Sequence, residues 1–163
     1  MEHGEITAFC GEGRGKTAAA LGQGILAAES GKSVIVIQFL KGKQKELGIL
    51  SRMEPELRIF RFEKYAENYN ELNPREQAEE AVNIRNALGF AKKVLVTGEC
   101  DLLILDEILG LFELGLMNVD EMKLLLEAKD ESTDLVVTGI HLKKELVPFM
   151  NKIYDIEPLK EQY

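Results

Sequence analysis

Residues 10–17 read Cys10-Gly11-Glu12-Gly13-Arg14-Gly15-Lys16-Thr17, and this stretch decides the class of fold. Its glycines let the backbone curl until N–H groups point at an anion, at the start of a helix. The lysine and threonine that follow are the residue types that reach phosphates and Mg²⁺ in a phosphate loop. The position that is ordinarily the first glycine of that pattern is Cys10 here. The stretch therefore predicts a phosphate loop that holds ATP with Mg²⁺.

Each residue of the loop has a predicted role. Lys16 adds a positive charge at the β- and γ-phosphates, so we assign it a catalytic role, and the Thr17 hydroxyl is placed to bind Mg²⁺. Arg14 is expected to contact phosphate. The residues expected to contact ATP are Gly11, Glu12, Gly13, Arg14, Gly15, Lys16, Thr17 and Ala18.

A second motif supports the first. Residues 102–107 form an apolar run that ends in Asp106 and Glu107, the arrangement by which phosphate-loop proteins bring carboxylates to their metal. We expect Asp106 and Glu107 to act as metal ligands, with Glu107 also catalytic. Three roles stay open for Glu107: a water-orienting residue, a second metal contact, or a solvated helix cap. The alternative is that residues 11–15 form only a flexible turn. Such a turn would not need Lys16 and Thr17 at the start of an alanine-rich helix.

Short β-branched runs alternate with longer segments of helical period, which is typical of crossover units and a parallel sheet. Several runs are apolar almost throughout, as in strands covered on both faces. We predict an α/β phosphate-loop NTPase fold, with a RecA-like, mostly parallel sheet of about six strands flanked by helices, in a single domain over residues 1–163. The predicted strands are 5–9, 33–39, 57–62, 101–105, 134–138 and 152–156.

Capping residues bound the predicted helices. Gly31 follows the alanine-rich segment after the phosphate loop, where glycine closes a helix. Asn73 and Glu76 have capping-box spacing, and Asn118 with Glu121 repeats it. The predicted helices are 16–29, 74–96 and 119–128.

Composition excludes several classes of function. The chain has 163 residues, 45% of them hydrophobic, and a formal net charge of −8. That charge argues against a broad nucleic-acid surface, and no apolar stretch approaches the roughly 20 residues of a membrane span. The start of the chain lacks a secretory pattern, so we expect a cytoplasmic protein. Cys10 and Cys100 indicate neither a disulfide framework nor a zinc site, and we expect buried thiols.

The whole chain resembles the corrinoid adenosyltransferases that use a phosphate loop, the type that acts on cob(I)alamin and cob(I)yrinic acid diamide. Their loop also lacks the first glycine. The stretches that carry the resemblance are 11–17, Val36-Ile37-Gln38-Phe39-Leu40-Lys41-Gly42, Leu103-Ile104-Leu105-Asp106-Glu107-Ile108, Val136-Val137-Thr138-Gly139 and Ile156-Glu157-Pro158-Leu159-Lys160.

The resemblance implies transfer of the 5′-deoxyadenosyl group from ATP to a reduced cobalt(I) corrinoid, with release of triphosphate, as a step of cobalamin biosynthesis. ATP, Mg²⁺ and a corrinoid are the implied ligands. A homodimer and a reductant protein such as a flavodoxin are the implied partners, and no nucleic acid or membrane is involved. No side-chain nucleophile is required, because the corrinoid's own cobalt is the nucleophile.

The chain departs from the family on the corrinoid side. It contains no tryptophan, whereas the family has a Phe-x-Trp element after the third strand; Ile140 stands where an arginine commonly follows Thr-Gly. Family members also continue, past the position of Tyr163, through a segment with His-Pro and Asp-Ala-Gly. These departures motivate the alternative of a phosphate-loop NTPase or nucleotide-responsive binding protein without corrinoid activity. A small kinase ranks last, for want of a lid segment.

The polar segment 63–72 stands after the third predicted strand, where the family has its Phe-x-Trp element. Its Tyr65 and Tyr69 are candidates to stack on the corrinoid, or else to pack over the long helix. Lys41, with Lys43 and Lys45, is expected to guide a phosphate or an acidic side group, or to lie in a solvated loop. A histidine just past a predicted strand end, as His141 is, is more often a loop residue than a ligand. His3 is expected to be mobile.

Overall fold

The computed structural model describes residues 4–41 and 48–162. Its centre is a six-stranded sheet in the order β3-β2-β4-β5-β1-β6, and every strand pair is parallel. The predicted α/β class and largely parallel sheet are therefore confirmed. The strands are β1 Ile6–Cys10, β2 Val34–Gln38, β3 Leu57–Phe60, β4 Leu102–Asp106, β5 Asp134–Thr138 and β6 Lys152–Asp155.

The predicted long helices also form, with ends one residue or less from those expected. The α-helices are α1 Lys16–Glu29, α2 Gly48–Ser51, α3 Pro74–Thr97 and α4 Val119–Glu127. Three short 3₁₀ helices, which the sequence pattern did not predict, are η1 Tyr69–Glu71, η2 Ile108–Leu111 and η3 Lys144–Phe149. Segments this short contain barely one period, so periodicity carries no signal for them.

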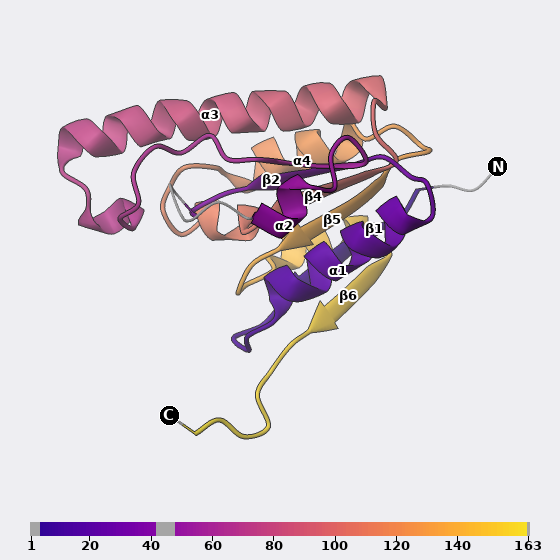
Figure 1. Ribbon diagram of the computed structural model, residues 1–163. Helices are drawn as coiled ribbons and strands as arrows, with labels where there is room; N and C mark the ends of the chain where they lie inside the picture. The colour runs from indigo at the N-terminus through magenta and orange to yellow at the C-terminus, as the bar shows by residue number, and fades with distance from the viewer. Residues whose placement is uncertain (1–3, 42–47, 163) are drawn as a thin grey trace.

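Helices cover both faces of the sheet (Figure 1). On one face, α1 contributes Ala20 and Ala28 to a cluster with side chains of β2 and β4 such as Val36 and Ile104. On the other, α3 and α4 pack with the alternate side chains of the same strands. Both faces are thus buried, which explains why β1, β2 and β4 are buried along their whole length.

The helix ends confirm most of the capping predictions. Asn73 and Glu76 exchange both capping-box hydrogen bonds at the start of α3. At α4, Asn118 accepts from the Glu121 backbone N–H as expected. The Glu121 carboxylate, however, pairs with Arg85 of α3, so it links the two helices.

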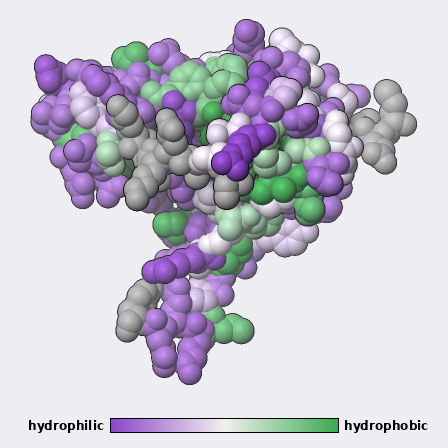
Figure 2. Space-filling view, in the orientation of Figure 1, coloured by the Kyte–Doolittle hydropathy of each residue, from purple (hydrophilic) through white to green (hydrophobic). Residues whose placement is uncertain are grey.

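The face of the molecule seen in Figure 2 is mostly hydrophilic, with hydrophobic areas around α1. The segment after β6 extends away from the body of the molecule (Figure 1). No helix within the described residues is long and apolar enough to span a membrane. Cys10 and Cys100 are free, buried thiols, as expected. The predictions for His3, Lys43 and Lys45 concern positions outside the described residues.

Candidate functional site

The phosphate loop lies between β1 and α1, as predicted. Gly11 and Gly15 adopt φ angles of 106° and 105°, in the left-handed region that favours glycine. A side chain at Gly11 would also overlap Asp155 and the Ile156 carbonyl. Backbone conformation therefore requires glycine at both positions, and close packing requires it at Gly11 as well.

The Lys16 side chain is held inside this loop. Its Nζ donates to the Gly13 carbonyl at 2.8 Å, and the residue is only 9% exposed. Ala18 lies on the exposed first turn of α1. Glu12 donates its backbone N–H to Glu157 at 3.2 Å, and the exposed Arg14 lies 3.8 Å from Glu161. Two acidic residues of the segment after β6 therefore contact the loop.

Asp106, at the end of β4, is the polar centre of the site. The Thr17 hydroxyl lies 2.9 Å from its Oδ1, and Thr138 donates to the same oxygen at 2.8 Å. Gln38 donates to Oδ2 at 3.2 Å. Asp106 is fully buried, and donors that stabilise the charged form are what a buried carboxylate needs. The ends of β2, β4 and β5 supply these groups at the same edge of the sheet.

Glu107 is held in an unusual backbone conformation beside Asp106. Its φ is 66°, which is rare for a residue with a side chain and marks a constrained position. Its N–H donates to Thr138 Oγ1 at 2.8 Å. Burial, together with the Asp106 charge, raises the pKa of Glu107, while Lys41 and Lys16 oppose that rise. Glu107 stands at the N-cap position of η2, and its side chain makes no capping hydrogen bond there.

Lys41 reaches the same oxygen atoms. Its Nζ lies 3.4 Å from Thr17 Oγ1 and 3.8 Å from Asp106 Oδ2. A cation therefore lies beside two of the oxygen groups that we predicted as Mg²⁺ ligands. Hydroxyl and carboxylate oxygens suit Mg²⁺, which binds one or two protein groups and takes its other ligands from water and substrate phosphates. Within the described residues, no three His, Cys, Asp or Glu side chains cluster as a metal site, and a site of this kind does not need such a cluster.

Sequence reasoning missed several polar residues of the site. No site role was predicted for Gln38 and Thr138, which appeared only in stretches similar to the family. Both are polar residues at the ends of buried strands, and this pattern could have identified them. Arg61 follows β3 and donates from Nε to Gln38 Oε1 at 2.7 Å. It extends the chain of hydrogen bonds from Asp106 to the next strand end.

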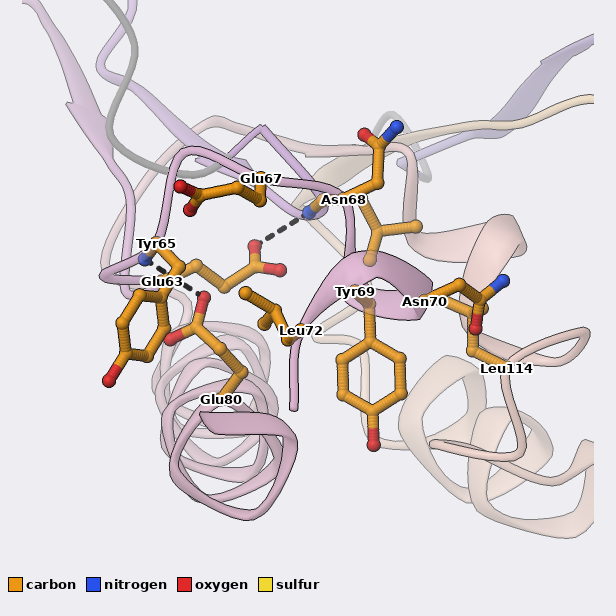
Figure 3. Close-up of a pocket in the computed structure, with 10 residues that line it drawn as sticks. Glu63, Tyr65, Glu67, Asn68, Tyr69, Asn70, Leu72, Glu80 and Leu114 are labelled. Atoms are coloured by element: carbon orange, nitrogen blue, oxygen red, sulfur yellow. Dashed lines mark hydrogen bonds between the residues drawn. The ribbon is translucent and has the colours of Figure 1, made fainter. Parts of the chain in front are cut away.

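A pocket of about 180 Å³ opens beside this site. Ten residues line it (Figure 3), and they come from the end of β2, from the loop before α3, from α3 itself and from the loop before α4. They are Leu40, Glu63, Tyr65, Glu67, Asn68, Tyr69, Asn70, Leu72, Glu80 and Leu114.

The two tyrosines of this loop are tied to the protein. The Tyr65 hydroxyl donates to Glu79 at 2.6 Å, which raises its pKa to about 12. Tyr69 packs against the core cluster beneath α3. Both residues line the pocket, and both also pack against the long helix, one of the two arrangements expected from the sequence.

Buried acids hold the pocket loop in place. Glu80 of α3 is 3% exposed and accepts the backbone N–H of Lys64 and Tyr65. Glu63 accepts the N–H of Leu40 at 2.6 Å, and Leu40 itself has a left-handed φ of 61°. Burial raises the pKa of Glu63 to about 7, with Leu40 N–H lowering it and Glu80 raising it further.

The region after β5 contributes backbone more than side chain. The Ile140 carbonyl accepts the Gly11 N–H at 2.9 Å, and its side chain is exposed. His141 is exposed and lies 3.6 Å from the Glu113 carboxylate. Neither side chain joins the group around Asp106.

Comparison with known proteins gives consistent matches over the whole chain. A model of the family described as ATP:corrinoid adenosyltransferase BtuR/CobO/CobP matches residues 2–163. The chain is 25% identical to the corrinoid adenosyltransferase of Escherichia coli strain K12, over 99% of this chain and 81% of that one. The same figures hold for the corrinoid adenosyltransferase CobA of Salmonella typhimurium strain LT2. Among solved structures, a DNA replication initiation factor has a TM-score of 0.40 at 15% identity, over 95% of this chain and 40% of that one.

Proposed function

Because the chain belongs to the ATP:corrinoid adenosyltransferase family, whose members are transferases, we propose that it moves the 5′-deoxyadenosyl group of ATP to a cob(I) corrinoid and releases triphosphate. The observation that carries this proposal is the grouping of Lys16, Thr17 and Asp106 at one edge of the sheet. That grouping supports a triphosphate site beside the pocket where a second substrate can approach.

The transfer is a displacement at the 5′-carbon. The electron pair of cobalt(I) forms the cobalt–carbon bond. The bond from the 5′-carbon to oxygen breaks, and its electron pair leaves with triphosphate. The cobalt is formally oxidised to cobalt(III) and no proton needs to move. The protein's task is to bind both substrates, align the 5′-carbon and exclude water.

The phosphate loop is the proposed cradle for triphosphate. The backbone N–H groups at the start of α1 point toward the anion, and Lys16 adds a positive charge. Lys16 is held by a neutral carbonyl, so exchanging that partner for a phosphate oxygen leaves no carboxylate unpaired. Lys41, already beside Thr17, is placed to contact the same phosphates.

Mg²⁺ is the proposed companion of ATP. Thr17, Asp106 and Glu107 are the residues that would hold it, directly or through water, and their oxygen atoms fit its preference. When bound, the ion would neutralise charge on the triphosphate leaving group. Thr138 and Gln38 keep the Asp106 carboxylate oriented, which is the part that outer residues play around a metal ligand.

An anaerobic assay tests the proposed function. Protein is mixed with Mg-ATP and chemically reduced cobalamin or cobinamide, and the corrinoid spectrum is followed while triphosphate is assayed. We expect conversion of cobalt(I) to alkylcobalt with an equal amount of triphosphate. Lys16→Ala should lower the rate by at least about tenfold, since hydrogen bonds to charged groups contribute about 1.5–3 kcal/mol.

Two other results would overturn the proposal. Release of ADP and phosphate without alkylcobalt would indicate the alternative, a phosphate-loop NTPase. Nucleotide binding with no turnover would indicate a nucleotide-responsive binding protein.

The partners and the compartment are also proposed from the family. We expect a homodimer, and the exposed Ile153 and Tyr154 on the edge strand β6 offer apolar surface for one. We expect a reductant protein such as a flavodoxin to supply the electron for cobalt(I), and we expect the reaction to take place in the cytoplasm. Light scattering of the purified protein tests the dimer.

A further inference from the structure

The pocket beside the phosphate site is positioned to contact the second substrate. Leu40 lines it, and the next residue, Lys41, reaches Thr17 and Asp106. On its other side, Leu40 packs so closely on Gly110 that an added side chain there would lie 2.9 Å from Leu40 Cδ1. A molecule whose edge enters the pocket therefore lies next to the bound triphosphate.

The size of the pocket limits what enters it. Pockets that enclose a whole organic ligand measure about 300–1,000 Å³, whereas this one measures about 180 Å³. It is too small for a corrin macrocycle and large enough for one of the short side groups at the macrocycle's rim. Leu72 and Leu114 give the pocket an apolar wall for the stem of such a group.

The charge of the pocket limits the chemistry of that group. Glu63, Glu67 and Glu80 are among the lining residues, and none of the ten described lining residues is cationic. The nearby Lys64 is directed to Glu79 and to the face of the Tyr65 ring. Among the described lining residues, a carboxylate group entering here would meet like charges and no cation, which is costly at a partly buried position.

An amide group would instead find hydrogen-bond acceptors in this pocket. Its NH₂ is a donor of two hydrogen bonds, and the glutamates that line the pocket offer carboxyl oxygens as acceptors. The Glu63 carboxyl lies at the centre of the lining residues (Figure 3), with one oxygen on the Leu40 N–H. Its other oxygen remains to accept from an amide.

We propose that this pocket selects the substrate by taking an amide side group from the corrinoid rim, so that fully amidated corrinoids react in preference to corrinoids with free carboxylates. The proposal rests on the proposed function and adds to it the substrate class. It assigns a specificity role to Glu63 and Glu67, which touch the rim of the substrate and take no part in the bond changes.

The test compares two substrates at saturating Mg-ATP and pH 8: reduced cobinamide, which is fully amidated, and reduced cobyrinic acid a,c-diamide, which keeps free carboxylates. We expect kcat/KM to favour cobinamide by about tenfold or more, because a site built for hydrogen-bond donors rejects a group that leaves its acceptors unpaired. The preference should persist at 0.5 M salt, where the long-range field of this acidic chain is screened.

Two variants with the same net charge separate the pocket from that long-range field. Glu67→Lys places a cation in the pocket and should reduce the preference severalfold. Glu71→Lys, in the same loop and also exposed but not lining the pocket, should leave the preference unchanged. Equal kcat/KM values for the two substrates in the wild type would overturn the proposal, as would equal effects of the two variants.

A binding measurement keeps this inference distinct from the transferase proposal. If neither corrinoid is adenosylated, the proposed function fails, and equilibrium dialysis with the oxidised corrinoids then tests the pocket by itself. Tighter binding of cobinamide that is lost in Glu67→Lys supports the amide pocket. Equal binding of both corrinoids, or binding of neither, overturns it.

Discussion

The Thr17 hydroxyl lies 2.9 Å from Asp106 Oδ1, although 89 positions separate the two residues in the chain. This contact joins the phosphate loop to the end of β4. It brings two of the proposed metal ligands together. The first prediction concerns one of them, the Asp106 carboxylate.

Asp106→Asn should weaken Mg²⁺-dependent ATP binding. The amide keeps the size of the side chain and removes the charge that attracts the cation, so the Mg²⁺ concentration for half-maximal binding should rise about tenfold or more. A fluorescent ATP analogue titrated with Mg²⁺ measures this. With EDTA present, variant and wild type should bind the analogue equally; a defect that persists without metal would show that Asp106 acts on folding of the loop.

Thr138→Val should lower both stability and nucleotide affinity. The Thr138 hydroxyl donates to Asp106 and accepts from the Glu107 N–H. Its loss leaves the Glu107 N–H without this partner and removes one of the donors that stabilise the buried Asp106 carboxylate. We expect the free energy of unfolding in urea to fall by about 2–4 kcal/mol.

Thr133→Val is the matched control for that prediction. Thr133 is equally buried, donates to the Cys100 carbonyl at 3.3 Å and lies at the start of β5, at the opposite end of the strand from Thr138. It should lose about 1 kcal/mol of stability and keep its affinity for ATP. Equal losses of affinity in the two variants would contradict a specific role for Thr138.

Stability should fall as pH rises from about 5 to 8, in part because of Glu63. Its pKa is about 7 in the folded protein and 4.5 ordinarily, so the folded state holds the proton more tightly and loses this advantage as the proton leaves. Glu63→Gln stays neutral and still accepts from Leu40. The stability of the variant relative to wild type should rise by on the order of 2 kcal/mol across this range. Parallel pH profiles from urea denaturation would contradict the prediction.

Two glycines of α1 should respond in opposite ways to alanine. Nothing lies within 4 Å of a Cβ at Gly22, so Gly22→Ala should stabilise the helix by about 0.5–1 kcal/mol. A Cβ at Gly24 would lie 3.0 Å from Cδ1 of the fully buried Ile104. Gly24→Ala should therefore destabilise the protein by about 1 kcal/mol. Equal stabilisation of both variants in urea would contradict the prediction, because it would mean that the packing of α1 on the sheet leaves space for a methyl group at Gly24.

Local pattern was enough to predict the strands and the long helices. The alanine-rich run after the loop and the capping box of Asn73 and Glu76 act within a few residues, so the sequence shows them directly. β2 and β4 are apolar along most of their length because both of their faces are buried, and this pattern is also visible within a few residues. The phosphate loop was predictable because the left-handed conformations at Gly11 and Gly15 are a property of those residues themselves.

The surroundings of Asp106 depended on the order of strands in the sheet. Gln38 and Thr138 reach Asp106 because β2 and β5 are the neighbours of β4, and strand order is not written in any local stretch. The same holds for Glu63, whose bond to Leu40 joins loops after two neighbouring strands.

By itself, then, the sequence determined the strands, the long helices and the glycine-dependent conformation of the phosphate loop. Each of these depends on conformational preferences and hydrophobic periods over a few residues. Only the tertiary structure decided which side chains surround Asp106, that Lys41 lies beside Thr17, and that the loop before α3 walls an acidic pocket. The physical reason is that these contacts join residues far apart in the chain, and they form only after burial of both sheet faces has brought the strand ends together.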